Sequence, residues 1–114
     1  MPIDDSAIEM LHQIQPADKP GFVTRMIKLY QTSTQTNIAQ LQEVYAINNL
    51  EQLTGAAHTL KSSNANIGAM EIASVAEELE RDCRRNNLAY CNQQITVIVQ
   101  EFNRVGIYFN DNFQ

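Results

Sequence analysis

Residue types on which many enzymes and metalloproteins depend are scarce in this 114-residue sequence, which has two cysteines, two histidines, four glycines, three prolines and no tryptophan. The cysteines, Cys83 and Cys91, lie eight residues apart with no CxxC or Cys/His spacing around them. A structural zinc site requires such spacings and is therefore not expected. Because nothing in the sequence indicates an oxidising compartment, we expect two reduced, partly buried thiols in place of a disulfide.

Motifs for nucleotide and hydrolase chemistry are missing as well, since the chain has no GxGxxG, Walker-type loop, HExxH or GxSxG. An autonomous enzyme is therefore not expected, and any chemistry must need very few residues. No apolar run approaches the roughly 20 residues that span a bilayer. The N-terminal MPIDDSAIEM is acidic, whereas a secretory signal is basic and then apolar. These features predict a cytoplasmic protein.

Basic residues are outnumbered, with 8 Lys and Arg against 13 Asp and Glu, for a formal net charge of −5. This balance argues against a nucleic-acid-binding module, because neutralising phosphates requires a basic face. It also disfavours docking to an anionic membrane surface. A chain of this length with 44% hydrophobic residues can form one modest core, so we expect a single domain over residues 1–114.

Apolar residues recur at intervals of three and four along most of the chain, which predicts helices. The expected helices cover Asp5–Gln13, Phe22–Ile47, Leu50–Asn66, a segment from Met70 to the basic cluster Arg81, Arg84 and Arg85, and Leu88–Phe109. In the third of these, Asn49 is placed as the N-cap and Gly68 as the C-cap. Short connections favour antiparallel neighbours. The sequence thus predicts an all-α fold, an antiparallel up-and-down four-helix bundle with a short N-terminal helix.

The third predicted helix has two different faces when its residues are placed at about 100° intervals. The half expected to face the core holds Leu53, Ala56, Ala57, Leu60, Ser63, Asn64 and Ile67. The opposite face surrounds His58 and holds Glu51, Thr54, Gly55, Lys61, Ser62 and Ala65. A typical solvated face carries long charged side chains throughout, and this one does not. We therefore expect His58 to be an accessible imidazole with one nearby cation and room for another protein.

A histidine alone on a helix surface is usually without function, and small residues are common wherever helices pack closely. The combination of a reachable imidazole, a cation one turn away and no bulky neighbour is what distinguishes His58. The other histidine, His12, lies near the end of the first predicted helix, outside this pattern. We expect it to be structural or simply exposed.

The stretch from Ala56 to Ala69 resembles the signature of histidine-containing phosphotransfer (HPt) domains. In that signature the histidine is followed by Leu at +2, Lys at +3, small residues from +4 to +7, an aliphatic residue at +9 and Gly at +10. The sequence supplies these residues in register as His58, Leu60, Lys61, Ser62, Ser63, Ala65, Ile67 and Gly68. The resemblance continues through Met70–Glu80 and, as a pattern of helices, over nearly the whole chain.

Two positions depart from the signature. The family often has glycine at +4, where this chain has Ser62, which is still small enough to let a partner approach. At +6 the family usually has a small residue, and this chain has Asn64 on the face predicted to be buried. Because a buried amide needs hydrogen-bond partners, we expect Asn64 to bond a neighbouring helix or a buried water.

The resemblance implies a phosphorelay intermediate in which His58 accepts a phosphoryl group from a receiver-domain aspartate and passes it to another response-regulator receiver. The receiver is expected to supply Mg²⁺, and no cofactor is expected on this chain. Lys61 would neutralise phosphate charge. Ser62, Ala65 and Thr54 would border the surface that meets the phosphate or the partner.

Glu80 matches the family position on the next helix that lies beside the histidine. A carboxylate there would hold the ring N–H that is not phosphorylated and so select the tautomer. Glu80 also precedes Arg84 by four residues, so an ordinary ion pair along one helix is the alternative interpretation. The sequence leaves both interpretations open.

A second function from a different class fits the same residues, namely a helical docking adaptor that binds a receiver or kinase without carrying phosphate. Either protein would have response-regulator receivers as partners, including those of a hybrid sensor histidine kinase. The chain is expected to be either free-standing or the cytoplasmic C-terminal domain of such a membrane kinase.

Overall fold

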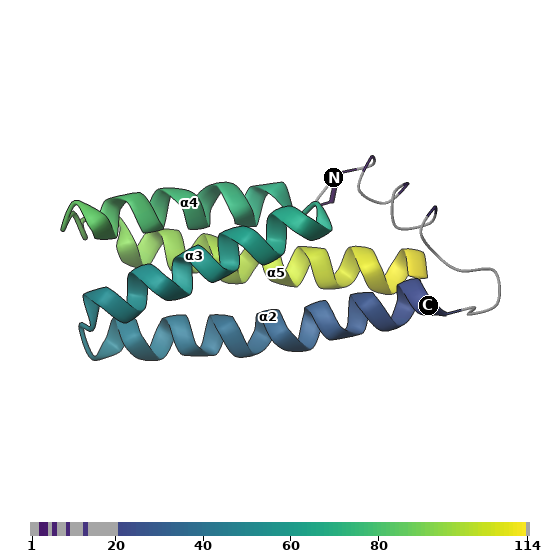
Figure 1. Cartoon of the computed structure of the whole chain (residues 1–114), viewed down its shortest axis with the longest axis horizontal. Helices are drawn as coiled ribbons and strands as arrows, with labels where there is room; N and C mark the ends of the chain where they lie inside the picture. Colours follow the sequence, from purple (N-terminus) through teal and green to yellow (C-terminus); the bar gives the residue numbers. More distant parts are fainter. Residues whose placement is uncertain (1–2, 5, 7–8, 10–12, 14–20, 114) are drawn as a thin grey trace.

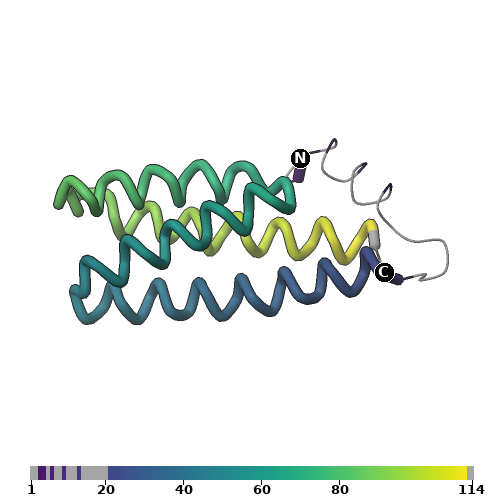
Figure 2. Tube along the Cα trace, viewed as in Figure 1, coloured from purple at the N-terminus to yellow at the C-terminus, as the bar shows by residue number. Residues whose placement is uncertain are grey.

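The computed structural model describes residues 3–4, 6, 9, 13 and 21–113, and this part of the chain contains four long α-helices and no strand. The helices are α2 (Phe22–Ala46), α3 (Leu50–Ile67), α4 (Met70–Arg84) and α5 (Cys91–Phe113). Consecutive helices run in opposite directions and lie side by side (Figure 1), and the Cα trace shows the same arrangement (Figure 2). The predicted all-α, up-and-down four-helix bundle is confirmed.

The helix boundaries agree with the apolar periodicity to within one residue except in α5, which differs at its start and continues to Phe113, past the predicted end at Phe109. This helix begins at Cys91, whereas the periodicity predicts a start at Leu88. Leu88 lies in the connection and is 40% exposed, so its predicted place in the apolar seam is wrong. The reason is the turn after α4, in which Asn86 adopts a left-handed φ of 56° and redirects the chain before α5 can begin. The other apolar residues that recur at intervals of three and four in this segment lie within α5: Cys91, Ile95, Ile98, Val105 and Phe109 are buried, and Phe102 is half-buried.

The short N-terminal helix predicted over Asp5–Gln13 falls mostly outside the described residues, and His12 lies wholly outside them. Near the start of the chain, Ile3 is buried with 1% exposure. The backbone N–H of Asp4 donates to the carbonyl oxygen of Gly68 over 2.9 Å. The described part of the N-terminus is therefore joined to the turn between α3 and α4.

Both ends of α3 have the predicted caps. The side chain of Asn49 accepts a hydrogen bond from the backbone N–H of Gln52 over 3.1 Å, which satisfies one of the unpaired donors at the helix start. Gly68 ends the helix with a φ of 87°, a conformation that glycine adopts without the steric cost that a Cβ would bring. These two caps define where α3 starts and stops, and hence where along the bundle its residues lie.

The core lies between the four helices and includes one polar residue of α3. Tyr30 of α2 packs edge-on against Phe102 and Phe109 of α5. Its hydroxyl donates to the side-chain oxygen of Asn64, and the Asn64 amide donates to the carbonyl oxygen of Leu60 over 2.8 Å. Asn64 is 0% exposed, so the prediction that this amide is buried and hydrogen-bonded to a neighbouring helix is confirmed.

The two cysteines are free thiols and both are buried. Burial raises the pKa of Cys91 to about 11, which keeps its thiol protonated near neutral pH.

The described helices include none that is long and apolar enough to cross a membrane.

Candidate functional site

His58 lies in the middle of α3 on the face that points away from the core. Its side chain is 56% exposed, whereas Ala57 and Leu60 beside it are 0% exposed. Thr54, Lys61, Ser62 and Ala65 are exposed or half-buried, as the helical wheel predicts. The orientation of α3 predicted from the sequence is therefore confirmed, and it follows from the apolar residues on the opposite half of the helix.

The antiparallel packing of α4 on α3 places Glu80 next to the imidazole. The Glu80 Oε2 atom lies 3.0 Å from His58 Nδ1, and the Glu80 side chain is only 8% exposed. An ionised carboxylate can only accept hydrogen bonds, so Nδ1 must carry the proton in this contact. In the neutral ring the lone pair is then on Nε2, which is the nitrogen left free for a nucleophilic attack.

Two cations also contact the Glu80 carboxylate. Arg84 Nη2 lies 2.7 Å from Oε2, and Lys61 Nζ lies 3.1 Å from Oε1. The Arg84 hydrogen bond is the main cause that lowers the pKa of Glu80 from 4.5 to about 2, with Lys61 and His58 lowering it further and burial opposing them. Glu80 is therefore ionised at neutral pH, as the tautomer assignment of His58 requires.

The sequence left two interpretations of Glu80 open, and the structure shows both contacts at once. One carboxylate has enough acceptor positions to meet the imidazole, the lysine and the arginine together. Arg84 is thus part of the His58 cluster, a place that sequence reasoning did not give it. The signal that could have found it was the basic cluster at the end of α4, combined with its spacing of four from Glu80.

The other residues predicted for the site lie near this cluster without joining it. The Thr54 hydroxyl donates to the carbonyl oxygen of Leu50 over 2.8 Å and so binds its own helix. Ser62 and Ala65 are exposed and line a groove of about 560 Å³ between α3 and the start of α4, to which Lys61 also contributes. Their small side chains leave the α3 surface beside His58 open on this side.

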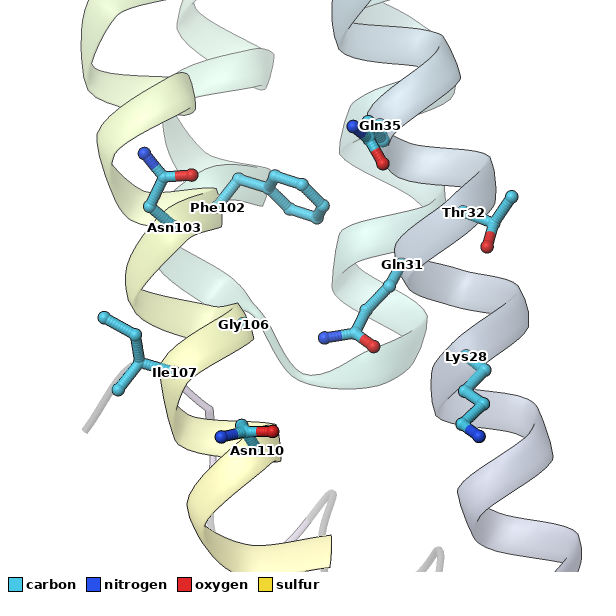
Figure 3. Close-up of a pocket in the computed structure, with 9 residues that line it drawn as sticks. All are labelled: Lys28, Gln31, Thr32, Gln35, Phe102, Asn103, Gly106, Ile107 and Asn110. Atoms are coloured by element: carbon cyan, nitrogen blue, oxygen red, sulfur yellow. The ribbon is translucent and has the colours of Figure 1, made fainter. Parts of the chain in front are cut away.

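A second groove, between α2 and α5, has a different character (Figure 3). It measures about 730 Å³, and Figure 3 shows Phe102 of α5 pointing toward α2 and Gln31 of α2 pointing toward α5. Lys28 is the only charged residue among the side chains that line it. The groove includes none of the residues around His58 and contains no nucleophile with an adjacent base, so it does not suggest a second reactive site.

Among the described residues, no group of three or more His, Cys, Asp or Glu side chains could hold a metal ion.

Comparisons with known proteins agree with the fold, and the range matched by the family model includes His58. The sequence model of the family described as Hpt domain matches residues 25–106. Among solved structures, the chain is similar to histidine-containing phosphotransfer protein B (HptB) from Pseudomonas aeruginosa PAO1, with a TM-score of 0.89. That match covers 96% of this chain and 92% of HptB at 22% sequence identity, so it shows a shared fold. Comparison with curated proteins finds no match.

Proposed function

Because the chain belongs to the Hpt domain family, we propose that it is a phosphorelay intermediate and that His58 is its phosphoacceptor. The observation that best supports this is an exposed imidazole whose Nδ1 is held by the buried Glu80 carboxylate, which leaves Nε2 available. The proposed donor and recipient are receiver domains of two-component systems. In this role the chain is a phosphoryl carrier and has no turnover without a receiver.

The proposed transfer starts with attack of the His58 Nε2 lone pair on the phosphorus of a receiver's aspartyl phosphate. The N–P bond forms as the bond between phosphorus and the aspartate oxygen breaks, and the bonding pair leaves with that oxygen. The proton on Nδ1 stays in place, so the phosphorylated ring has a positive charge that the Glu80 carboxylate offsets. The same steps in reverse pass the group to the aspartate of the next receiver.

The cations of the cluster would act on the charge of the transferred group. Phosphoryl transfer depends mainly on positioning and on neutralising the phosphoryl oxygens. Lys61 is one helical turn from His58 and its side chain is 32% exposed, so its ammonium group can approach an incoming phosphoryl group and neutralise part of its negative charge. We expect Mg²⁺ to be bound by the receiver. We also propose that residues 1–114 act as one such domain in the cytoplasm, either free-standing or as part of a sensor kinase.

The proposal is tested by incubating the purified chain with a receiver domain that holds ³²P-labelled phosphoaspartate. We expect label to move to the wild-type chain and to be lost on mild acid treatment, as a phosphoramidate bond requires. His58→Gln should receive no label, whereas Thr59→Ala, a change at the neighbouring exposed position, should be labelled normally. Label that persists in His58→Gln, or that survives acid as a phosphoserine does, would contradict the assignment.

The docking adaptor is the alternative that shares the same surface. For an adaptor, His58→Gln would bind a receiver with unchanged affinity and would retain its effect in cells. For a phosphoryl carrier, the same variant binds but interrupts the signal. Calorimetry should therefore show receiver binding by His58→Gln under both functions, and the signal that the variant transmits in cells, measured beside the labelling experiment, separates them.

A further inference from the structure

A groove at the C-terminal end of α4 gathers an unusual share of the positive charge of this acidic protein. It measures about 310 Å³ and is lined by Lys61, Glu77, Glu80, Arg81, Arg84 and Arg85. Four of the eight Lys and Arg residues of the chain thus meet in one place. The six lining residues have a net charge of +2, whereas the whole chain has −5.

Two of these four cations are not used by the His58 cluster. Lys61 and Arg84 pair with Glu80, but Arg81 and Arg85 form no ion pair with any residue that the structure describes. Both are exposed, and at a spacing of four residues their side chains lie on the same side at the end of α4. The surplus positive charge of the groove is therefore on Arg81 and Arg85 and is accessible from solvent.

Helix stability alone does not account for this arrangement. A cation in the last turn of a helix interacts favourably with the helix dipole, and Arg81 and Arg84 both lie there, whereas Arg85 is the C-cap residue beyond the helix. Like charges four residues apart repel each other by roughly 0.2–0.5 kcal/mol, so the proximity of Arg85 to Arg81 offsets part of that gain. A partner that brings negative charge would convert this repulsion into binding.

Resting on the proposed function, we propose that Arg81 and Arg85 form a docking surface for carboxylate side chains of the receiver domain, next to the face that meets His58. The groove is large enough for one or two carboxylates and borders the cluster through Lys61 and Glu80. Outside this groove the chain has a net charge of about −7, so an acidic partner finds the largest cluster of lining cations here. Such an asymmetry orients the encounter and raises the association rate.

The test compares two double variants that lose the same charge. Arg81→Gln/Arg85→Gln changes the groove, and Arg25→Gln/Lys28→Gln changes exposed cations on α2. At limiting receiver concentration and low salt, we expect phosphotransfer to the groove variant to be at least about 10-fold slower than to the wild type. The control variant should be close to the wild type. The groove variant should also lose most of the salt dependence of the rate and bind the unphosphorylated receiver more weakly.

Direct labelling with phosphoramidate, a small phosphodonor that needs no docking, separates this proposal from the proposed function. We expect it to label His58 equally in the wild type and in both double variants. Equal labelling with unchanged transfer and salt dependence in the groove variant would overturn the docking surface alone. Failure of the wild type to take label at His58 would overturn the proposed function, and receiver binding would then still test the groove. Binding of an oligonucleotide or of anionic vesicles that only the groove variant loses, with receiver affinity unchanged, would assign the groove to another partner and overturn the proposal.

Discussion

Replacing Glu80 by glutamine should destabilise the protein by an amount that depends on pH. The substitution keeps the shape of the side chain but removes the charge that Lys61, Arg84 and His58 share. A pKa lowered from 4.5 to about 2 corresponds to roughly 3 kcal/mol, at about 1.4 kcal/mol per pKa unit. The Arg84 and His58 side chains are 64% and 56% exposed, so solvent screening reduces this value and we expect a loss of about 1–2 kcal/mol at pH 7.

The direction of the pH dependence follows from the lowered pKa of Glu80. A carboxyl group that is more acidic in the folded state than in the unfolded state contributes its full stabilisation above the unfolded pKa of about 4.5. That stabilisation is lost as the pH falls toward the folded pKa of about 2. The free energies of unfolding of the wild type and of Glu80→Gln should therefore differ most above about pH 6 and converge as the solution is acidified.

Urea unfolding followed by circular dichroism at several pH values between 3 and 7 measures this difference. Glu77→Gln is the matched control, because Glu77 lies on the same helix and lines the same groove but forms no ion pair among the described residues. We expect that control to stay within about 0.5 kcal/mol of the wild type. Equal stability of Glu80→Gln and the wild type at pH 7, or a difference that does not change with pH, would refute the cluster as described.

Three further substitutions test other parts of the structure. Asn64→Leu leaves the buried Tyr30 hydroxyl without its acceptor and should lower the free energy of unfolding by about 1–3 kcal/mol. Adding Tyr30→Phe should recover part of this loss, because the hydroxyl that lost its partner is then removed. No recovery in the double variant would contradict the hydrogen bond. Gly68→Ala places a Cβ at a φ of 87° and should cost about 1 kcal/mol in the same assay, so an unchanged stability would contradict the cap. Lys61→Ala should shorten the lifetime of phosphorylated His58 after labelling with phosphoramidate while the fold is retained, and an unchanged lifetime would exclude a role in neutralising the phosphoryl charge.

The helices and the orientation of α3 could be predicted because they depend on local patterns. Apolar residues at intervals of three and four determine which side of a helix is buried, and His58 lies opposite Leu53 and Leu60 whatever the neighbouring helix is. Asn49 and Gly68 act as caps through their own backbone and side-chain chemistry. The start of α5 was placed wrongly because Leu88 keeps the spacing of the seam although the left-handed turn at Asn86 removes it from the helix.

The partners of Asn64 could be predicted only as a class. A buried amide must be hydrogen-bonded, but the sequence does not say to what. Tyr30 is 34 residues away and becomes the partner because α2 packs directly on α3. Such a contact depends on how two helices are rotated and shifted against each other, which local periodicity does not specify.

The sequence alone predicted an exposed histidine with small neighbours and a lysine one turn away, because all of these residues lie on one helix of known geometry. Only the packing of α4 against α3 decided that Glu80 meets that histidine and that Lys61 and Arg84 share its carboxylate. The same packing places Arg81 and Arg85 beside them without an ion pair to any described residue. The helical repeat determines which residues of one helix are neighbours. Contacts between helices depend instead on how the packed core fixes the shift and the rotation of each helix against the next.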